Sequence, residues 1–288
     1  MMNLNYGRFI SACLLFGSNG IVASHIDLGS HEIVYLRTFI GSLFLIALFL
    51  LTGGRFSVRA KGRDLFFLVL SGVAMGASWM FLYEAYRQTG VGIATLAYYC
   101  GPVLVMALAP VIFREKLAFA RVLALIAAMF GMVLVNGGDV LRGGFSWGLV
   151  CGLMSAVMLA AMVVFNKMAE SITGFENAVL QLTVSFLTVA AFVVFRQGIF
   201  VSVPPGSLLP VIVLGLVNTG LGCYLYFSSM QRLPAQSVAI IGYLEPLSAL
   251  VLAAFMLGER LAAVQITGAV LILGGAAWGE YFGQKTGR

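Results

Sequence analysis

Charged residues are scarce in this sequence. Only 10% of the 288 residues are Asp, Glu, Lys or Arg, whereas 61% are hydrophobic and the mean hydropathy is +1.01. Soluble domains carry charge on about a quarter of their residues, so the composition excludes a soluble protein. Apolar runs of roughly twenty residues recur with short breaks, and one transmembrane helix needs that length. The alternation of period two that would indicate an outer-membrane barrel is missing.

Motifs for metal, nucleotide and hydrolytic chemistry are also missing. The four cysteines fall in apolar runs without CxxC spacing, which favours small buried hydrophobes over disulfides or a metal site. They are Cys13, Cys100, Cys151 and Cys223. No P-loop or HExxH sequence occurs, so nothing indicates a cofactor, an ATP-driven pump or a metalloprotease. Residues 144–148 (GFSWG) match the hydrolase pattern GxSxG, but that motif requires a strand-to-helix turn on a parallel sheet, which this chain does not offer.

Breaks at charged or Gly/Pro clusters predict ten transmembrane helices, and no cleavable signal peptide precedes them. The helices are predicted at 7–24, 32–52, 64–86, 91–113, 119–136, 146–168, 175–196, 207–228, 236–256 and 261–282. Pro246 follows Pro102 by 144 residues, which is half the chain length, and Glu259 follows Glu115 by the same 144. We therefore predict an all-α polytopic membrane protein of two five-helix repeats. The repeats are 1–136 and 146–288, with a linker at 137–145.

Lys and Arg are distributed unevenly between the two ends of these helices. With a cytoplasmic N-terminus, twelve of them lie on the inner side and four on the outer side, and Arg37 lies inside a helix. The net charge of +6 is thus an orientation signal rather than a sign of nucleic-acid binding, and it places both termini in the cytoplasm. Because each repeat has an odd number of helices, the repeats would be inverted. Inverted repeats are typical of secondary transporters, which bind substrate near the membrane midplane.

Several short motifs resemble those of one transporter family, the ten-helix EamA branch of the drug/metabolite transporter superfamily. The residues that carry the resemblance are 16–19 (FGSN), 36–37 (LR), Pro102, Glu115, 244–246 (LEP) and 257–259 (LGE). The resemblance covers nearly the whole chain and implies export of small metabolites, with most similarity to bacterial exporters of amino acids, including aromatic ones. The sequence departs from the family pattern at Gly101, which stands where the second half has Glu245.

Two charged residues are expected inside the bilayer. Glu245 would lie about 14 Å along its helix at 1.5 Å per residue, close to the middle of a core about 30 Å thick. It could bind a substrate ammonium or carry a proton, or it could be a structural carboxylate. Arg37, about 8 Å deep, could hold a substrate carboxylate or form an ion pair with Glu32, Glu84 or Glu245.

Prolines and aromatic residues complete the candidate site. Pro102 and Pro246 each remove one helical hydrogen bond, so they predict kinks that could act as hinges. Trp79, Tyr83 and Tyr86 share one face of the third predicted helix and could stack on a substrate or pack against another helix. The other predicted substrate-binding residues are Ser18, Asn19, Tyr98, Tyr99, Met162, Asn166, Asn218 and Tyr243. Interhelical hydrogen bonding is the alternative role for the polar groups inside helices.

Together these features predict a secondary transporter of the inner membrane that works by alternating access. It would export amino acids, aromatic ones included, or similar small metabolites, through a cavity lined by the first, third, fourth, sixth, eighth and ninth helices. Its partners would be a small-molecule substrate and the lipid bilayer, with no catalytic residues, cofactor, metal or nucleic acid. The alternatives are a multidrug or amine exporter, which would need several deep carboxylates, and an intramembrane enzyme, which would need a clustered catalytic set.

Overall fold

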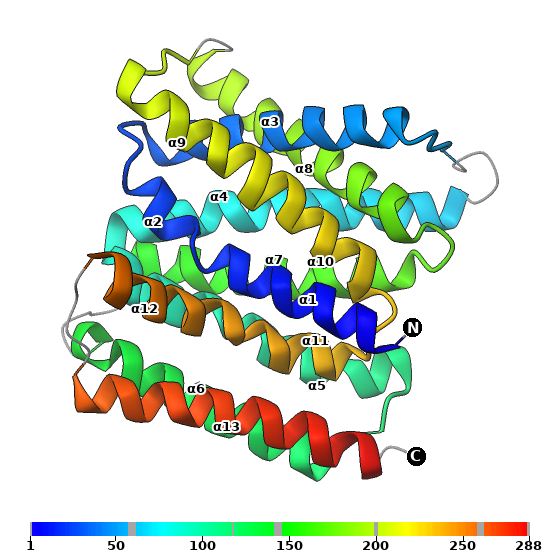
Figure 1. The fold of residues 1–288 in the computed structure, drawn as a ribbon, viewed down its shortest axis with the longest axis vertical. Coiled ribbons are helices and arrows are strands. Elements are labelled where there is room, and N and C mark those ends of the chain that lie inside the picture. The colour runs from blue at the N-terminus through cyan, green and yellow to red at the C-terminus, as the bar shows by residue number, and fades with distance from the viewer. Residues whose placement is uncertain are drawn as a thin grey trace.

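The fold of the chain is a bundle of helices that lie side by side (Figure 1). The computed structural model describes residues 2–56, 62–116, 118–140, 146–198, 201–257 and 262–286, and all regular structure within these residues is helical. Both ends of the chain lie at the same end of the bundle, which we call the termini end.

Six helical stretches of the described residues, some of them made of more than one element, are long and apolar enough to cross a membrane. They are Ser30–Leu51, Gly62–Thr89, Ala94–Phe113, Trp147–Met168, Gly174–Arg196 and Pro205–Met230. Two shorter apolar helices are Phe119–Leu134 and Ile266–Gly279. The prediction of an all-α membrane protein with several spans is therefore confirmed.

Five predicted helices form as single elements. They are α3 (Ser30–Leu51), α6 (Phe119–Val140), α7 (Trp147–Met168), α8 (Gly174–Gln197) and α13 (Ala263–Thr286). Ser146 accepts a hydrogen bond from the amide of Leu149 at 3.3 Å, so it caps α7 and is not a nucleophile on a sheet. Residues 137–140 of the predicted linker belong to α6, and 141–145 lie outside the described residues.

The predicted break between the third and fourth helices is misplaced. α4 (Gly62–Tyr98) stays helical through 87–90, and the break falls at Tyr99 and Cys100, before α5 (Gly101–Phe113). A glycine such as Gly90 costs a helix only about 1 kcal/mol, whereas a proline inside it costs about 3 kcal/mol. Pro102, which has no amide hydrogen to bond the preceding turn, therefore decides where the helix ends.

Three other predicted helices are interrupted. The first is divided into α1 (Met2–Phe16) and α2 (Asn19–Ala23), and the ninth into α11 (Ala235–Gly242) and α12 (Leu244–Leu257). The eighth consists of η2 (Pro205–Ser207), α9 (Leu208–Val213), η3 (Leu214–Leu221) and α10 (Gly222–Met230). The segment η3 is a π-helix, a form often found at functional sites.

A close approach joins the α1–α2 break to α12. A Cβ atom on Gly17 would lie 2.8 Å from the carbonyl oxygen of Glu245 and 2.7 Å from the amide nitrogen of Ala249. No side chain fits so close to backbone atoms, so glycine is required at this contact. The contact fixes the start of α12, and with it Glu245, against the first helix.

Candidate functional site

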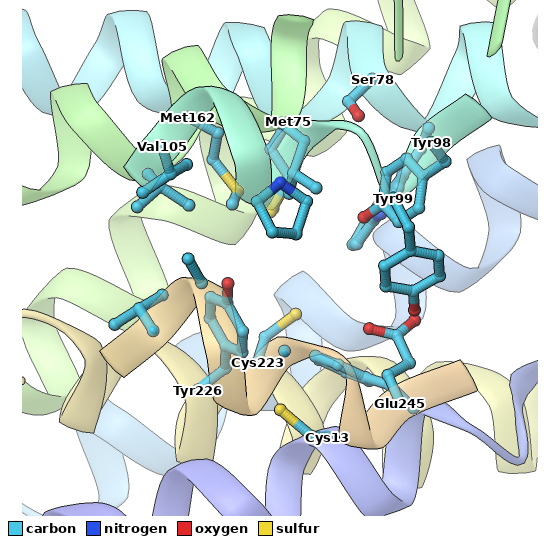
Figure 2. Close-up of a pocket in the computed structure, with 18 of the residues that line it drawn as sticks. Cys13, Met75, Ser78, Tyr98, Tyr99, Val105, Met162, Cys223, Tyr226 and Glu245 are labelled. Atoms are coloured by element: carbon cyan, nitrogen blue, oxygen red, sulfur yellow. The ribbon is translucent and has the colours of Figure 1, made fainter. Parts of the chain in front are cut away.

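A cavity lies in the middle of the bundle, and the space between its walls that no atoms occupy, open solvent included, is about 800 Å³ (Figure 2). Its walls come from α1, α2, α3, α4, α5, α7, α10, α11 and α12, and so from both halves of the sequence. All the helices that were predicted to line a cavity contribute to it, and α3 contributes as well through Arg37.

Many of the predicted site residues line this cavity. They are Asn19, Arg37, Trp79, Tyr98, Tyr99, Pro102, Met162 and Glu245. Pro102 and Pro246 both lie in the first turn after a helix break, the former in α5 and the latter in α12, and only Pro102 reaches the cavity. Both prolines thus follow a backbone break, and their role as hinges stays a prediction.

The Glu245 carboxyl group faces the cavity from the first turn of α12. The Tyr99 hydroxyl group points at this carboxyl group and forms a hydrogen bond with it (Figure 2). Tyr99 is held in turn by Tyr243, whose hydroxyl group donates to the Tyr99 carbonyl oxygen at 2.9 Å. The rings of Tyr98 and Tyr99 meet edge to face at 5.1 Å. The carboxylate therefore has one fixed donor, and its other lone pairs remain accessible from the cavity.

Arg37 reaches the cavity from α3 and is only 3% exposed. Its Nε donates to the Thr219 hydroxyl oxygen at 2.9 Å, its Nη1 donates to the Tyr83 hydroxyl oxygen at 3.2 Å, and its guanidinium lies 4.7 Å from the centre of the Trp79 ring. Thr219 belongs to η3, so the π-helical turn presents the hydroxyl group that orients the guanidinium.

The ion pair considered for Arg37 is not formed. The structure shows no salt bridge from Arg37 to Glu32, Glu84 or Glu245, although its charge interacts with Glu245 at longer range. Among the described residues, no acceptor is bonded to Nη2. A buried guanidinium without a carboxylate partner is costly, and an anionic group of a ligand would complete it.

Other predicted site residues lie outside the cavity lining and bond to neighbouring helices. The Asn166 amide donates to Asn177 Oδ1 at 3.0 Å and to Gln181 Oε1 at 3.1 Å, and all three side chains are fully buried. The Asn218 amide donates to the Ser18 hydroxyl oxygen at 2.7 Å. These bonds fit the alternative interpretation of interhelical contacts.

Tyr83 and Tyr243 stand directly behind the cavity wall. Tyr83 bonds to Arg37 and packs on Tyr86 at 5.6 Å between ring centres, so only the first member of the aromatic stripe, Trp79, reaches the cavity. Tyr243 is completely buried and bonds to the Tyr99 backbone. Both residues position groups that do face the cavity.

The lining also contains residues that the sequence reasoning missed. They are Cys13, Phe16, Met75, Ser78, Val105, Leu159, Val163, Cys223, Tyr226, Phe227, Val238, Ala239 and Gly242. Met75 and Val105 were within reach of prediction, since they lie one turn before Trp79 and one turn after Pro102 on the same helix faces. The two cysteines were correctly expected to be buried, but nothing in the sequence set Cys13 and Cys223 apart from the others.

The chemistry of the cavity combines one cation and one carboxylate with aromatic and sulfur-containing walls. Asn19 adds a buried Oδ1 that accepts no hydrogen bond from the described residues. Within the same residues, no group of three His, Cys, Asp or Glu side chains could hold a metal ion. The arrangement offers a donor for an anion, acceptors for a cation and aromatic faces for an apolar group.

Comparison with known proteins agrees with this geometry. The sequence pattern that defines the EamA-like transporter family occurs twice in the chain, at residues 6–137 and 146–278. The chain is 28% identical to the "Uncharacterized transporter YxxF" of Bacillus subtilis over 273 residues, which are 94% of this chain and 87% of the relative. It is 26% identical over 200 residues to a "Probable amino-acid metabolite efflux pump" of Salmonella typhimurium, covering 64% of this chain and 65% of that protein.

A solved crystal structure has the same fold, with a TM-score of 0.82 at 19% identity over 97% of this chain and 99% of that chain. At this identity the likeness shows the fold alone. The two family matches together cover most of the sequence, including the residues on both sides of the cavity. The chain therefore belongs to the EamA-like transporter family.

Proposed function

We propose that this protein is a secondary transporter that exports amino acids, aromatic ones included, or similar small metabolites across the inner membrane by alternating access. The observation that carries the proposal is that one aromatic-walled cavity contains both the Arg37 guanidinium and the Glu245 carboxyl group, which do not form an ion pair with each other. The relative named as a probable amino-acid metabolite efflux pump supports the same cargo class.

A zwitterion fits the two charged groups. The substrate carboxylate would bind the free Nη2 of Arg37, and the ammonium group would bind Glu245 and Asn19 Oδ1. An aromatic side chain would lie against Trp79 and Tyr98. Hydrogen bonds to charged groups contribute about 1.5–3 kcal/mol each, so the loss of either one should weaken binding roughly 10- to 100-fold.

We further propose ten spans in two inverted five-helix repeats, 1–136 and 146–288. The double match to the family supports this arrangement. Equivalent helix bounds support it too, because α12 (Leu244–Leu257) corresponds at the offset of 144 to 100–113, which α5 (Gly101–Phe113) nearly fills. Tyr99 and Tyr243 are 144 residues apart and touch each other, as equivalent residues near a two-fold axis would.

The proposed orientation places the termini end in the cytoplasm. It is supported by the excess of Lys and Arg on that side of the predicted helices and by the common location of both termini (Figure 1). The bilayer is the proposed partner of the outer helix faces, where residues such as Leu51, Phe195 and Phe255 are exposed.

The alternatives find less support. An exporter of polyamines would need several carboxylates, and Glu245 is the one carboxylate among the cavity-lining residues that the structure describes. An enzyme would need a catalytic cluster, whereas Ser146 of the GxSxG match caps a helix. Membership of a transporter family also argues against an enzyme.

Counterflow in proteoliposomes tests the proposal. Vesicles with purified protein are loaded with unlabelled phenylalanine, and uptake of labelled phenylalanine, leucine, lysine, glutamate and spermidine is compared with that of protein-free vesicles. We expect the zwitterionic amino acids to exchange, with phenylalanine ahead of leucine, and the cargo with a net charge, namely lysine, glutamate and spermidine, to lag. Exchange of spermidine in place of amino acids would establish the amine alternative, and no exchange of any amino acid would contradict the proposed cargo.

A further inference from the structure

A network of hydrogen bonds lies at the termini end, where the connection between α5 and α6 meets the start of α11 (Figure 1). The Glu115 carboxylate accepts from the backbone amides of Ala235 at 2.7 Å and Gln236 at 3.3 Å. Both amides belong to the first turn of α11, where no preceding helical carbonyl can bond them. A carboxylate is the favoured partner at such a helix start, so Glu115 caps α11 across 120 residues of sequence.

Side chains of α11 return to the same connection. The Gln236 amide donates to the Lys116 carbonyl oxygen at 3.1 Å and accepts from Arg121 Nη1 at 3.5 Å. Arg121 also donates to the Ser237 hydroxyl oxygen at 3.4 Å, and the Tyr6 hydroxyl lies 3.3 Å from that same oxygen. The first turn of α11 is thereby tied to α1 and α6 as well as to Glu115.

Lys167 adds α7 to the network. Its ammonium group donates to the Leu233 carbonyl oxygen, just before α11, and its charge interacts with Glu115. It also lies 5.7 Å from the centre of the Phe113 ring, at the end of α5. Glu115 therefore caps a helix start and also interacts, at longer range, with the charge of the partly buried Lys167.

The helix that Glu115 caps also forms part of the cavity wall. Val238 and Ala239, about one turn beyond the capped amides, line the cavity. The helix has only 8 residues and lies between Pro234 and the break at Tyr243. Met230 and Leu233, which lie at the end of α10 and just before α11, are both buried and belong to the same core cluster as Val238 and Ala239. A short helix with a break at each end can move as a unit, and the hydrogen-bond network holds the first turn of α11 in place.

We propose that Glu115 is the latch of a gate at the termini end, and that release of the α11 first turn from Glu115 opens the cavity toward this side. The inference rests on the proposed alternating access, since only a transporter needs the cavity to open there. Glu115 lies outside the cavity lining, so its role is to set the balance between conformations and not to bind substrate.

Thiol labelling of a cavity residue tests this latch without measuring transport. Leu159→Cys places a reporter on the cavity wall in a chain whose four natural cysteines are replaced by Ser. A membrane-impermeant maleimide is applied from each side in turn, in inverted and right-side-out vesicles. Glu115→Gln keeps the shape of the side chain but removes its charge. We expect the reporter to be labelled roughly tenfold faster from the termini side, as the loss of a charge-assisted cap predicts.

Two further variants make the result decisive. Gln236→Met removes the hydrogen bonds to Lys116 and Arg121 at nearly constant side-chain volume, and we expect it to speed labelling from the termini side as well. If only one of Glu115→Gln and Gln236→Met fails to fold, the other still tests the latch. Glu170→Gln is the matched control, because Glu170 is an exposed carboxylate at the same end, in the α7–α8 connection. It should leave the labelling rate unchanged.

The outcomes distinguish a failure of the proposed latch from a failure of the proposed cargo. Unchanged labelling in folded Glu115→Gln and Gln236→Met proteins would overturn the latch, and so would an equal increase in Glu170→Gln. Faster labelling of Glu115→Gln from the termini side, in a protein that exchanges no amino acid, would support the latch and contradict the proposed cargo.

Discussion

Two helix breaks, at Tyr99 and at Tyr243, face each other at the centre of the molecule and have different roles. Each is followed within three residues by a proline in the first turn of the next helix. Tyr99 faces the cavity and bonds to the Glu245 carboxyl group, whereas Tyr243 is completely buried and bonds to the Tyr99 backbone. One break thus supplies a donor to the cavity, and the other supplies the carboxylate and the support.

The difference lies in the residue before each proline. Glu245 precedes Pro246, and Gly101 precedes Pro102. A Cβ atom on Gly101 would lie 2.8 Å from Leu159 Cδ2 and 3.0 Å from the Ala156 carbonyl oxygen. The first break is packed so closely on α7 that a side chain has no room there, so the cavity receives a carboxylate from one break alone. A single carboxylate beside a single guanidinium matches a zwitterion better than a dication.

Gly101→Glu would break this comparison and has the largest expected effect. The new side chain must displace α7 and bury a carboxylate, which together should cost several kcal/mol. We expect the unfolding temperature in detergent to fall by roughly 10 °C or more, or the protein to fail to accumulate. Gly274→Ala is the matched control, since a Cβ atom there meets nothing within 4 Å. If Gly101→Glu unfolds at the temperature of the native protein, close packing does not explain the asymmetry.

Glu245→Gln tests the other side of the comparison. Gln can still accept the Tyr99 hydrogen bond, so the unfolding temperature should change little. The apparent KM for phenylalanine counterflow should rise roughly 10- to 100-fold, because the charge opposite the ammonium group is lost. A cargo without an ammonium group, 3-phenylpropionate, serves as the control and should not lose affinity. A lower unfolding temperature with unchanged KM and unchanged pH dependence would instead assign Glu245 a structural role and remove it from substrate binding and coupling.

The sequence predicts the helices well and the breaks less well, for a physical reason. Lipid-spanning length and scarcity of charge leave a strong signal, whereas the position of a break depends on which of several weak signals dominates. Gly90 suggests a break that does not form, because Pro102 ends the helix instead. The π-helix η3 leaves no trace in the apolar pattern, nor does the close packing of its Gly215 against Ile40.

The candidate site, too, could be predicted from the sequence only in part. A polar group inside a membrane helix is costly without a partner, so the sequence points to such groups but does not say what the partner is. Glu245 and Asn19 face the cavity, whereas Asn166 and Asn218 satisfy the same need by bonding to other helices. Apolar wall residues such as Val163 and Val238 resemble any lipid-facing or core residue, so their position follows only from the packed structure.

Removing each tyrosine hydroxyl group sharpens the comparison, with the smallest expected effects. Tyr99→Phe takes away the one fixed hydrogen-bond donor of Glu245. Because a typical hydrogen bond contributes about 0.5–1.5 kcal/mol, the KM for phenylalanine should change roughly 2- to 10-fold, and stability should be nearly retained. Tyr243→Phe removes a bond to a backbone carbonyl, so it should lower the unfolding temperature by about 1–3 °C and leave KM in place. Counterflow and thermal unfolding on both variants separate the two roles. The reverse pattern, with Tyr243→Phe changing KM and Tyr99→Phe only stability, would mean that the second break, and not the first, supplies the hydroxyl group that the substrate site depends on.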